Sequence, residues 1–286
     1  MPQSSRGQCT RRMGLSRLSS GADTSHRSFK QPVDSQALVW RYMDFAKYVA
    51  MLNDGALYFA RLDTLGDPFE GSLSKSNYEL LRQIERAGEA SGKLPPDWRG
   101  RYFDVLMGST RRARKQCYVS CWHMNSAESE AMWRLYSSSG YAIAVVTTYA
   151  QLACALPSEF EPSEYSGPYL GVVRYADHQT DATPSGNIFD PVMHKRPSFQ
   201  HEQECRAVLW RHGPRNRRTA EPLPESVIDA YASGVRLCVE LQKLIQRVTV
   251  SPHAPSWFAT SVKDVTQRYG LGFPVEQSSL NLLPYL

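Results

Sequence analysis

The charged residues of one short segment are the first candidates for chemistry in this sequence. The segment His201–Trp210 carries Glu202, Glu204 and Arg206 at every second position. Alternate side chains of a β-strand project from the same face, so two carboxylates and a guanidinium would line one wall of a cleft. A strand seldom carries this much charge on one face unless the charges are paired or the face is wet. The alternative interpretation is a surface strand whose charges form salt bridges.

Residues elsewhere in the chain could complete such a cleft. Arg41 and Tyr42 end the first predicted strand, and Ser120 lies inside a later one. Trp133 and Tyr136 are also candidates, but their helical spacing is typical of core residues. Ser120 has a structural alternative too, as a small residue that packs inside the sheet.

The pattern of apolar and turn-forming residues predicts the elements that would hold these side chains. A strand at 38–42 leads into a helix that begins after Asp44 and ends at Gly55, and a second strand follows at 56–60. Further strands are expected at 117–122, 140–147, 170–175, 202–210, 235–239, 247–251 and 273–277. Further helices are expected at 77–90, 97–115, 225–232 and 256–269, with a short one that carries Met132, Trp133 and Tyr136. The polar stretch 177–197 predicts a loop or lid.

Length and composition favour one folded domain. The chain has 286 residues, of which 42% are hydrophobic and 21% are charged, as in globular proteins. Residues 1–33 are rich in serine and arginine and have no apolar period, so we expect a disordered leader there and a single domain at 34–286. Strands occur both singly between helices and as neighbours, which indicates an α+β fold with a split sheet.

Charge and cysteine usage limit the other functional classes. The net charge of +5 includes basic runs at 11–12, 111–115 and 215–218, through which nucleic acid could bind; such runs are also typical of solvated surfaces. Cys117-x-x-x-Cys121 followed by His123 lacks the second ligand pair of a zinc site, so no metal is expected. No apolar stretch approaches the roughly 20 residues that span a bilayer, and no signal peptide is evident. We therefore expect a soluble protein of the bacterial cytoplasm.

A set of short motifs resembles a family known as domain of unknown function 2971, which is mainly bacterial. The order of the motifs carries the resemblance, since each alone is weak. They span about Leu38 to Ser278 and are found at 39–42, 55–60, 66–70, 118–122, 132–136, 140–143 and 202–206. Gly66 departs from the pattern, because the family usually has asparagine there. By similarity the family is grouped with the ADP-ribosyltransferase superfamily, whose members hold NAD between two small antiparallel sheets.

The resemblance implies roles for particular residues in transfer of ADP-ribose from NAD. The superfamily triad of a first-strand Arg or His, a middle Ser or Tyr and a late Glu falls on Arg41, Ser120 and Glu204. Glu204 would stabilise the oxocarbenium-like transition state, and Glu202 would orient or deprotonate the acceptor.

The remaining site residues would bind the dinucleotide or support the carboxylates. Arg41 would bind the diphosphate, Tyr42 or Trp122 would stack on nicotinamide, and Arg206 would position the carboxylates. The loop Asp67–Glu70 is interpreted as a rigid turn anchored by Phe69, with a cleft-bordering role as the alternative.

The resemblance leaves several functions open. The first is an ADP-ribosyltransferase that uses NAD as substrate and modifies a macromolecule or small acceptor, for instance as a toxin or phage-defence effector. The second is a non-catalytic module of the same fold that binds a nucleotide or nucleic acid. The third is an enzyme similar to the RNA 2′-phosphotransferases.

Overall fold

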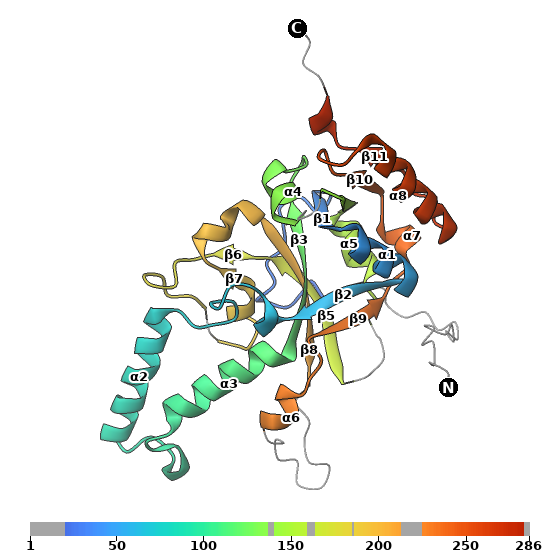
Figure 1. The fold of residues 1–286 in the computed structure, drawn as a ribbon. Helices are drawn as coiled ribbons and strands as arrows, with labels where there is room; N and C mark the ends of the chain where they lie inside the picture. The colour runs from blue at the N-terminus through green and yellow to red at the C-terminus, as the bar shows by residue number, and fades with distance from the viewer. Residues whose placement is uncertain (1–20, 137–139, 159–163, 185, 213–224, 283–286) are drawn as a thin grey trace, which may run out of the picture.

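A computed structural model describes residues 21–136, 140–158, 164–184, 186–212 and 225–282 (Figure 1). Its strands are β1 (Leu38–Asp44), β2 (Ala56–Arg61), β3 (Cys117–Met124), β4 (Ala142–Thr148), β5 (Tyr165–Val172), β6 (Arg174–Tyr175), β7 (His194–Lys195), β8 (Glu204–Arg211), β9 (Gly234–Cys238), β10 (Arg247–Val250) and β11 (Val275–Gln277). Its α-helices are α1 (Phe45–Asp54), α2 (Lys75–Ala90), α3 (Tyr102–Gln116), α4 (Glu130–Tyr136), α5 (Tyr149–Ala155), α6 (Glu225–Asp229), α7 (Leu241–Leu244) and α8 (Ser256–Arg268).

One large sheet forms the centre of the molecule (Figure 1). Its strand order is β11-β10-β4-β1-β3-β2-β9, and β8 and β5 are added through β3. The strand pairs are antiparallel except for β10 with β11, so the sheet is mixed. β6 and β7 form a separate parallel pair. The expected α+β class is therefore confirmed in its coarse form.

The chain opens with the predicted strand, helix and strand. Gly55 ends α1 with φ of 59°, a left-handed conformation in which a side chain would be strained. Tyr48, Met51 and Leu52 are the buried residues of α1. The turn at Gly55 returns the chain to the sheet, and this local chemistry explains why the sequence alone located all three elements.

Strand β3 has two different neighbours along one of its edges. β8 pairs with nearly the whole of β3 on one side. On the other side β2 pairs with Tyr118 and Val119, whereas β1 pairs with His123 and Met124. The backbone between these two pairings, at 120–122, is the point where β1 and β2 diverge. A side chain from either strand can enter the gap.

The two faces of the sheet bury different side chains. The largest apolar cluster contains Trp122, Cys205 and Ala207 from β3 and β8 together with side chains of α1, α5, α7 and α8. The opposite face carries two smaller clusters, one around Val119 and Val208 and another that joins β1 to α4. Charged side chains that emerge on this second face are thus surrounded by protein.

The packed part of the chain extends upstream of residue 34, where the domain was expected to begin. Asp23 and Lys30 form bridges with β5, and Phe29 is 2% exposed. A Cβ at Gly171 would lie 2.7 Å from the backbone of Phe29, so glycine is required for this close approach. Residues 21–33 therefore belong to the fold, whereas residues 1–20 lie outside the described residues.

Helices α2 and α3 form an arm that projects from the sheet (Figure 1). Ser74 caps α2 by accepting a hydrogen bond from the backbone of Asn77, so the helix begins earlier than predicted. The two helices meet through Phe103, whose ring contacts Tyr78 edge-on at 4.8 Å and lies 3.5 Å from the guanidinium of Arg82. The tip of the arm includes a short 3-10 helix (Pro96–Trp98), and α3 begins only at Tyr102.

Cysteine usage in the fold is mixed. Cys117, Cys121, Cys154 and Cys205 are free thiols, as expected, while Cys238 is disulfide-bonded. No group of three or more potential ligands among the described residues could hold a metal ion. Every helix in the described ranges is too short or too polar to cross a bilayer.

Candidate functional site

The expected charged strand is interrupted between its two glutamates. β8 begins at Glu204, while Glu202 is the last residue of a 3-10 helix (Pro197–Glu202). Gln203 between them adopts a left-handed conformation with φ of 39°. Strand alternation therefore applies to Glu204 and Arg206 but not to Glu202, and the prediction of three residues on one strand face is wrong for that residue.

A buried guanidinium organises the carboxylates on the second face of the sheet. The side chain of Arg206 is fully buried. Its Nε and Nη2 donate to the two oxygens of Glu204 at 2.6 and 3.0 Å, and Nη2 also donates to Glu70 at 2.7 Å. Nη1 donates to the carbonyl oxygen of Val192 at 2.6 Å. Arg206 therefore contacts two carboxylates at once, and its role in positioning them for a reaction stays a prediction.

Lys195 draws Glu202 into the same cluster. Its Nζ lies 2.7 Å from Glu202, 3.1 Å from Glu70 and 3.3 Å from Glu204. Burial lowers the pKa of this ammonium, but the charges of Glu204 and Glu70 outweigh burial and raise it above its ordinary value. We name this set of three carboxylates and two cations, Glu70, Lys195, Glu202, Glu204 and Arg206, the acidic cluster.

Two glutamates of the acidic cluster, Glu202 and Glu204, have pKa values shifted in opposite directions. Burial would raise the pKa of Glu204, but Arg206 and Lys195 outweigh it and lower this pKa to about 2. Burial raises the pKa of Glu202, and the hydrogen bond from Lys195 offsets the rise only in part. Glu204 is therefore a fixed anion at neutral pH, whereas Glu202 is the better proton acceptor.

Arg41 occupies the gap where β1 and β2 diverge. Nη1 donates to Ser120 Oγ at 2.8 Å, and Nη2 donates to the carbonyl oxygen of Tyr58 on β2 at 2.7 Å. The guanidinium also lies 5.7 Å from the ring of Trp122. Within the described part of the chain it has no carboxylate partner, and burial lowers its pKa to about 10. Arg41 is a half-buried cation held by neutral groups.

Arg41 and Ser120 meet, but Glu204 emerges from the other face of the sheet. In the β3–β8 register Ser120 is opposite Ala207, whereas His123 is opposite Glu204. Successive residues of a strand point to opposite faces, so Ser120 and Glu204 are separated by the sheet. The three expected triad residues thus form two groups, Arg41 with Ser120 and Glu204 with Arg206.

Cys121 and Tyr136 interact electrostatically with members of both groups. Both interact electrostatically with Arg41. Burial raises the pKa of Cys121 and of Tyr136, and the charge of Glu204 raises both further. Tyr136 ends α4 and is 41% exposed, so its ring does not lie in the core as its helical spacing indicated.

The other aromatic residues predicted for the site, Tyr42, Trp133 and Trp122, are buried in packing contacts within the protein. Tyr42 is buried edge-on against Trp133 at 4.8 Å, and its hydroxyl accepts a hydrogen bond from the backbone of Ser129. Trp133 is fully buried, as expected. Trp122 is buried too, and its Nε1 donates to Ser120 at 3.2 Å. Of these rings, Trp122 is the one in contact with Arg41.

The predicted rigid turn at 67–70 contributes charges to the site. Asp67 accepts two hydrogen bonds from Arg196, at 2.8 and 3.1 Å, and the guanidinium of Arg196 lies over the ring of Phe69. Glu70 enters the acidic cluster. The turn is anchored mainly by its two carboxylates, and Phe69 is only half-buried.

Sequence reasoning missed Glu70, Lys195 and His123 as members of the site. Glu70 lies in the motif at 66–70, whereas Lys195 lies in the predicted loop 177–197, where the local sequence does not indicate a site residue. His123 Nδ1 donates to the carbonyl oxygen of Glu202 at 2.6 Å, because that oxygen can only accept. Burial lowers the pKa of His123, and its Nε2 is buried without a partner among the described residues.

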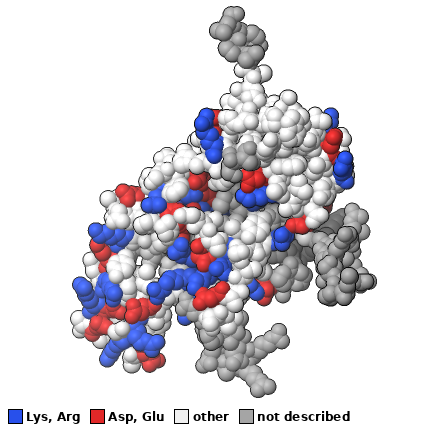
Figure 2. Space-filling view, viewed as in Figure 1, with Lys and Arg blue, Asp and Glu red and all other residues white. Residues whose placement is uncertain are grey.

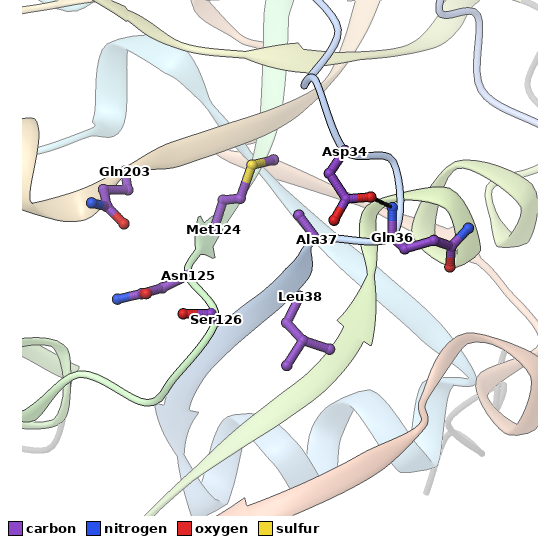
Figure 3. A pocket seen from close by; sticks show the side chains of 8 residues that line it. All are labelled: Asp34, Gln36, Ala37, Leu38, Met124, Asn125, Ser126 and Gln203. Carbon is purple, nitrogen blue, oxygen red and sulfur yellow. Dashed lines mark hydrogen bonds between the residues drawn. The ribbon is translucent and has the colours of Figure 1, made fainter.

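A surface hollow of about 450 Å³ is lined by residues that precede and begin β1, end and follow β3 and precede β8 (Figure 3). Its polar side chains come from three separate segments and are Asp34, Gln36, Asn125, Ser126 and Gln203. Gln203 stands between Glu202 and Glu204 in the chain, but none of the five residues of the acidic cluster lines the hollow.

Of the basic runs, only 111–115 falls within the described residues; 11–12 and 215–218 lie outside them. Arg111 is exposed, but Lys115 pairs with Asp229. The side chain of Arg114 packs at Gly71, and Nε of both Arg112 and Arg114 is buried. The run is therefore largely occupied by contacts within the protein.

No protein-family model, no curated protein and no solved structure matches this chain. The resemblance to domain of unknown function 2971 accordingly stays a prediction.

Proposed function

We propose that this protein transfers ADP-ribose from NAD to an acceptor. The observation that carries the proposal is Arg41, a half-buried cation at the divergence of β1 and β2 that has no carboxylate partner among the described residues. Removing a cation from water without a counter-charge is costly, and a bound anion offsets that cost. A diphosphate matches the planar donor pattern of a guanidinium.

The acidic cluster supports the same reaction. It has three carboxylates against two cations, so it carries excess negative charge when all five groups are ionised. Such a fixed charge favours the positive charge that develops on the ribose as the bond to nicotinamide breaks. Nicotinamide leaves with the bonding electrons, and the acceptor forms the new bond at the same ribose carbon.

Glu202 is the residue suited to accept the proton that the acceptor loses. Its pKa is raised by burial, and it is the least enclosed carboxylate of the acidic cluster. A base with a raised pKa takes up a proton more readily at neutral pH. Tyr136, an exposed ring that interacts electrostatically with Arg41 and with Glu202, would border the nicotinamide riboside.

Turnover of labelled NAD tests the proposal. Arg41→Ala should weaken NAD binding roughly 10- to 100-fold, as expected for loss of a charged hydrogen bond, and Glu204→Gln should abolish transfer. Arg236→Ala is the matched control, because Arg236 is paired with Tyr58 across β2 and β9 but already has Asp54 as its counter-ion. Wild-type protein that neither binds nor consumes NAD would contradict the proposal. Product analysis separates ADP-ribosyl transfer from removal of an RNA 2′-phosphate.

A further inference from the structure

The α2–α3 arm, residues 75–116, carries the whole net charge of the protein. It contains ten Lys and Arg residues against five Asp and Glu, a net +5, which equals the formal charge of the full chain. Figure 2 shows basic side chains gathered over this arm. The rest of the chain is electrically balanced, so attraction of an anionic partner would be centred on the arm.

Three of the seven basic side chains on α2 and α3 outside the tip are held by contacts within the protein. Arg82 stacks on Phe103 and pairs with Glu85. Lys115 pairs with Asp229, and Arg114 packs at Gly71. Arg82, Arg114 and Lys115 therefore serve the fold more than a partner.

The tip of the arm, residues 91–102, gathers three exposed cations in a short segment, and of these Arg99 donates only to the backbone carbonyl of Leu94. Lys93, Arg99 and Arg101 are exposed, and none of them forms an ion pair within the described ranges. Glu89, the nearest acidic side chain of α2, accepts a hydrogen bond from the backbone of Gly100 at 2.7 Å. Asp97 is the acidic residue of the tip itself, which leaves a net charge of +2 over residues 91–102.

Two aromatic rings lie among these cations. Trp98 is 36% exposed, and its ring centroid is 5.7 Å from that of Tyr102 at a tilt of 50°. The short 3-10 helix that begins at Pro96 presents Trp98 at the end of the arm. A large exposed ring beside unpaired cations is the composition of surfaces that bind single-stranded nucleic acid, where bases stack and phosphates are neutralised.

We propose that the tip of the α2–α3 arm binds single-stranded nucleic acid. Lys93, Arg99 and Arg101 contact successive phosphates, and an unpaired base stacks on Trp98. A duplex fits less well because its bases are already stacked on one another. A bilayer fits less well because Trp98 is the one large apolar side chain exposed at the tip, and Leu94 is packed at Gly88.

Fluorescence anisotropy with labelled oligonucleotides of about 15 nucleotides, within the range of single-strand site sizes, tests the proposal without NAD. The affinity of wild-type protein should fall as salt rises from about 50 to about 200 mM. Replacing Lys93, Arg99 and Arg101 together by alanine should reduce the slope of log affinity against log salt by about 2, since each phosphate contact contributes roughly 0.7. Trp98→Ala should weaken binding about 5- to 150-fold.

Arg134→Ala is the control, because Arg134 is an exposed arginine whose partner is Glu130 on the same helix. It should leave both affinity and salt slope unchanged. The substituted residues of the tip are exposed, so the variants should keep the melting temperature of the wild type. The proposal is overturned if the protein binds vesicles of anionic lipid but no oligonucleotide, if it binds neither, or if the triple variant binds with unchanged slope. None of these outcomes bears on NAD turnover.

Discussion

Replacing Glu204 by glutamine gives the sharpest test of the acidic cluster, because the carboxylate is removed while the shape of the side chain is kept. Glu204 is 2% exposed and accepts two hydrogen bonds from the guanidinium of Arg206. Breaking a buried ion pair on one side leaves the other charge uncompensated. We expect Glu204→Gln to lower the free energy of unfolding by about 3–5 kcal/mol at neutral pH.

The pH dependence of this loss follows from the pKa of Glu204. That pKa is lowered from 4.5 to about 2 in the folded protein. The folded value lies below the unfolded one, so the stabilisation is complete well above the unfolded pKa and is lost as pH falls through the folded pKa. A pKa difference of this size means that ionised Glu204 stabilises the folded state by about 3 kcal/mol at neutral pH. About half of this stabilisation is lost by about pH 3.3.

Urea denaturation followed by circular dichroism at neutral pH and near pH 3.3 measures both quantities. The stability gap between wild type and Glu204→Gln should shrink by about 1–2 kcal/mol at the lower pH. Glu240→Gln is the control, since Glu240 is exposed and its one ion pair within the described residues is with Lys243; it should change stability by less than about 1 kcal/mol. A stability gap between wild type and Glu204→Gln below about 1 kcal/mol at neutral pH, or one independent of pH, would refute the conclusion that Glu204 is buried and ionised.

Two further substitutions test the surroundings of the site. Gln203→Gly should raise the free energy of unfolding by about 1 kcal/mol, because glycine adopts φ of 39° without strain; an unchanged urea midpoint would contradict the left-handed turn. Gly171→Ala should lower it by about 1–3 kcal/mol, because the added Cβ would lie 2.7 Å from Phe29. Limited proteolysis should then cut residues 21–33 faster than in wild type, and equal rates would show that this segment is not held at β5.

Local chemistry explains which elements the sequence could predict. Gly55 and the apolar face of α1 located the opening strand, helix and strand, and continuous apolarity located β4. The start of the folded domain was placed too late, because tertiary contacts decide it. Residues 21–33 lack an apolar period, yet Phe29 packs them against β5.

The site could be predicted only in part, because its members come together through pairing between distant segments. Arg206 and Glu204 share a strand, so their contact followed from spacing. The left-handed turn at Gln203 removes Glu202 from that strand, and Lys195 restores it to the acidic cluster from a loop that carried no signal. The position of Ser120 on the opposite face depends on the β3–β8 register, which spacing does not reveal.

We propose that the diphosphate of NAD binds at the guanidinium of Arg41, which is held by neutral groups and has no carboxylate partner among the described residues. A crystal structure with a non-hydrolysable NAD analogue tests it most directly. We expect diphosphate oxygens within hydrogen-bond distance of Arg41 and the nicotinamide riboside between Tyr136 and Glu202. An analogue bound with its diphosphate away from the divergence of β1 and β2, or a crystal that takes up none at saturating concentration, would contradict it.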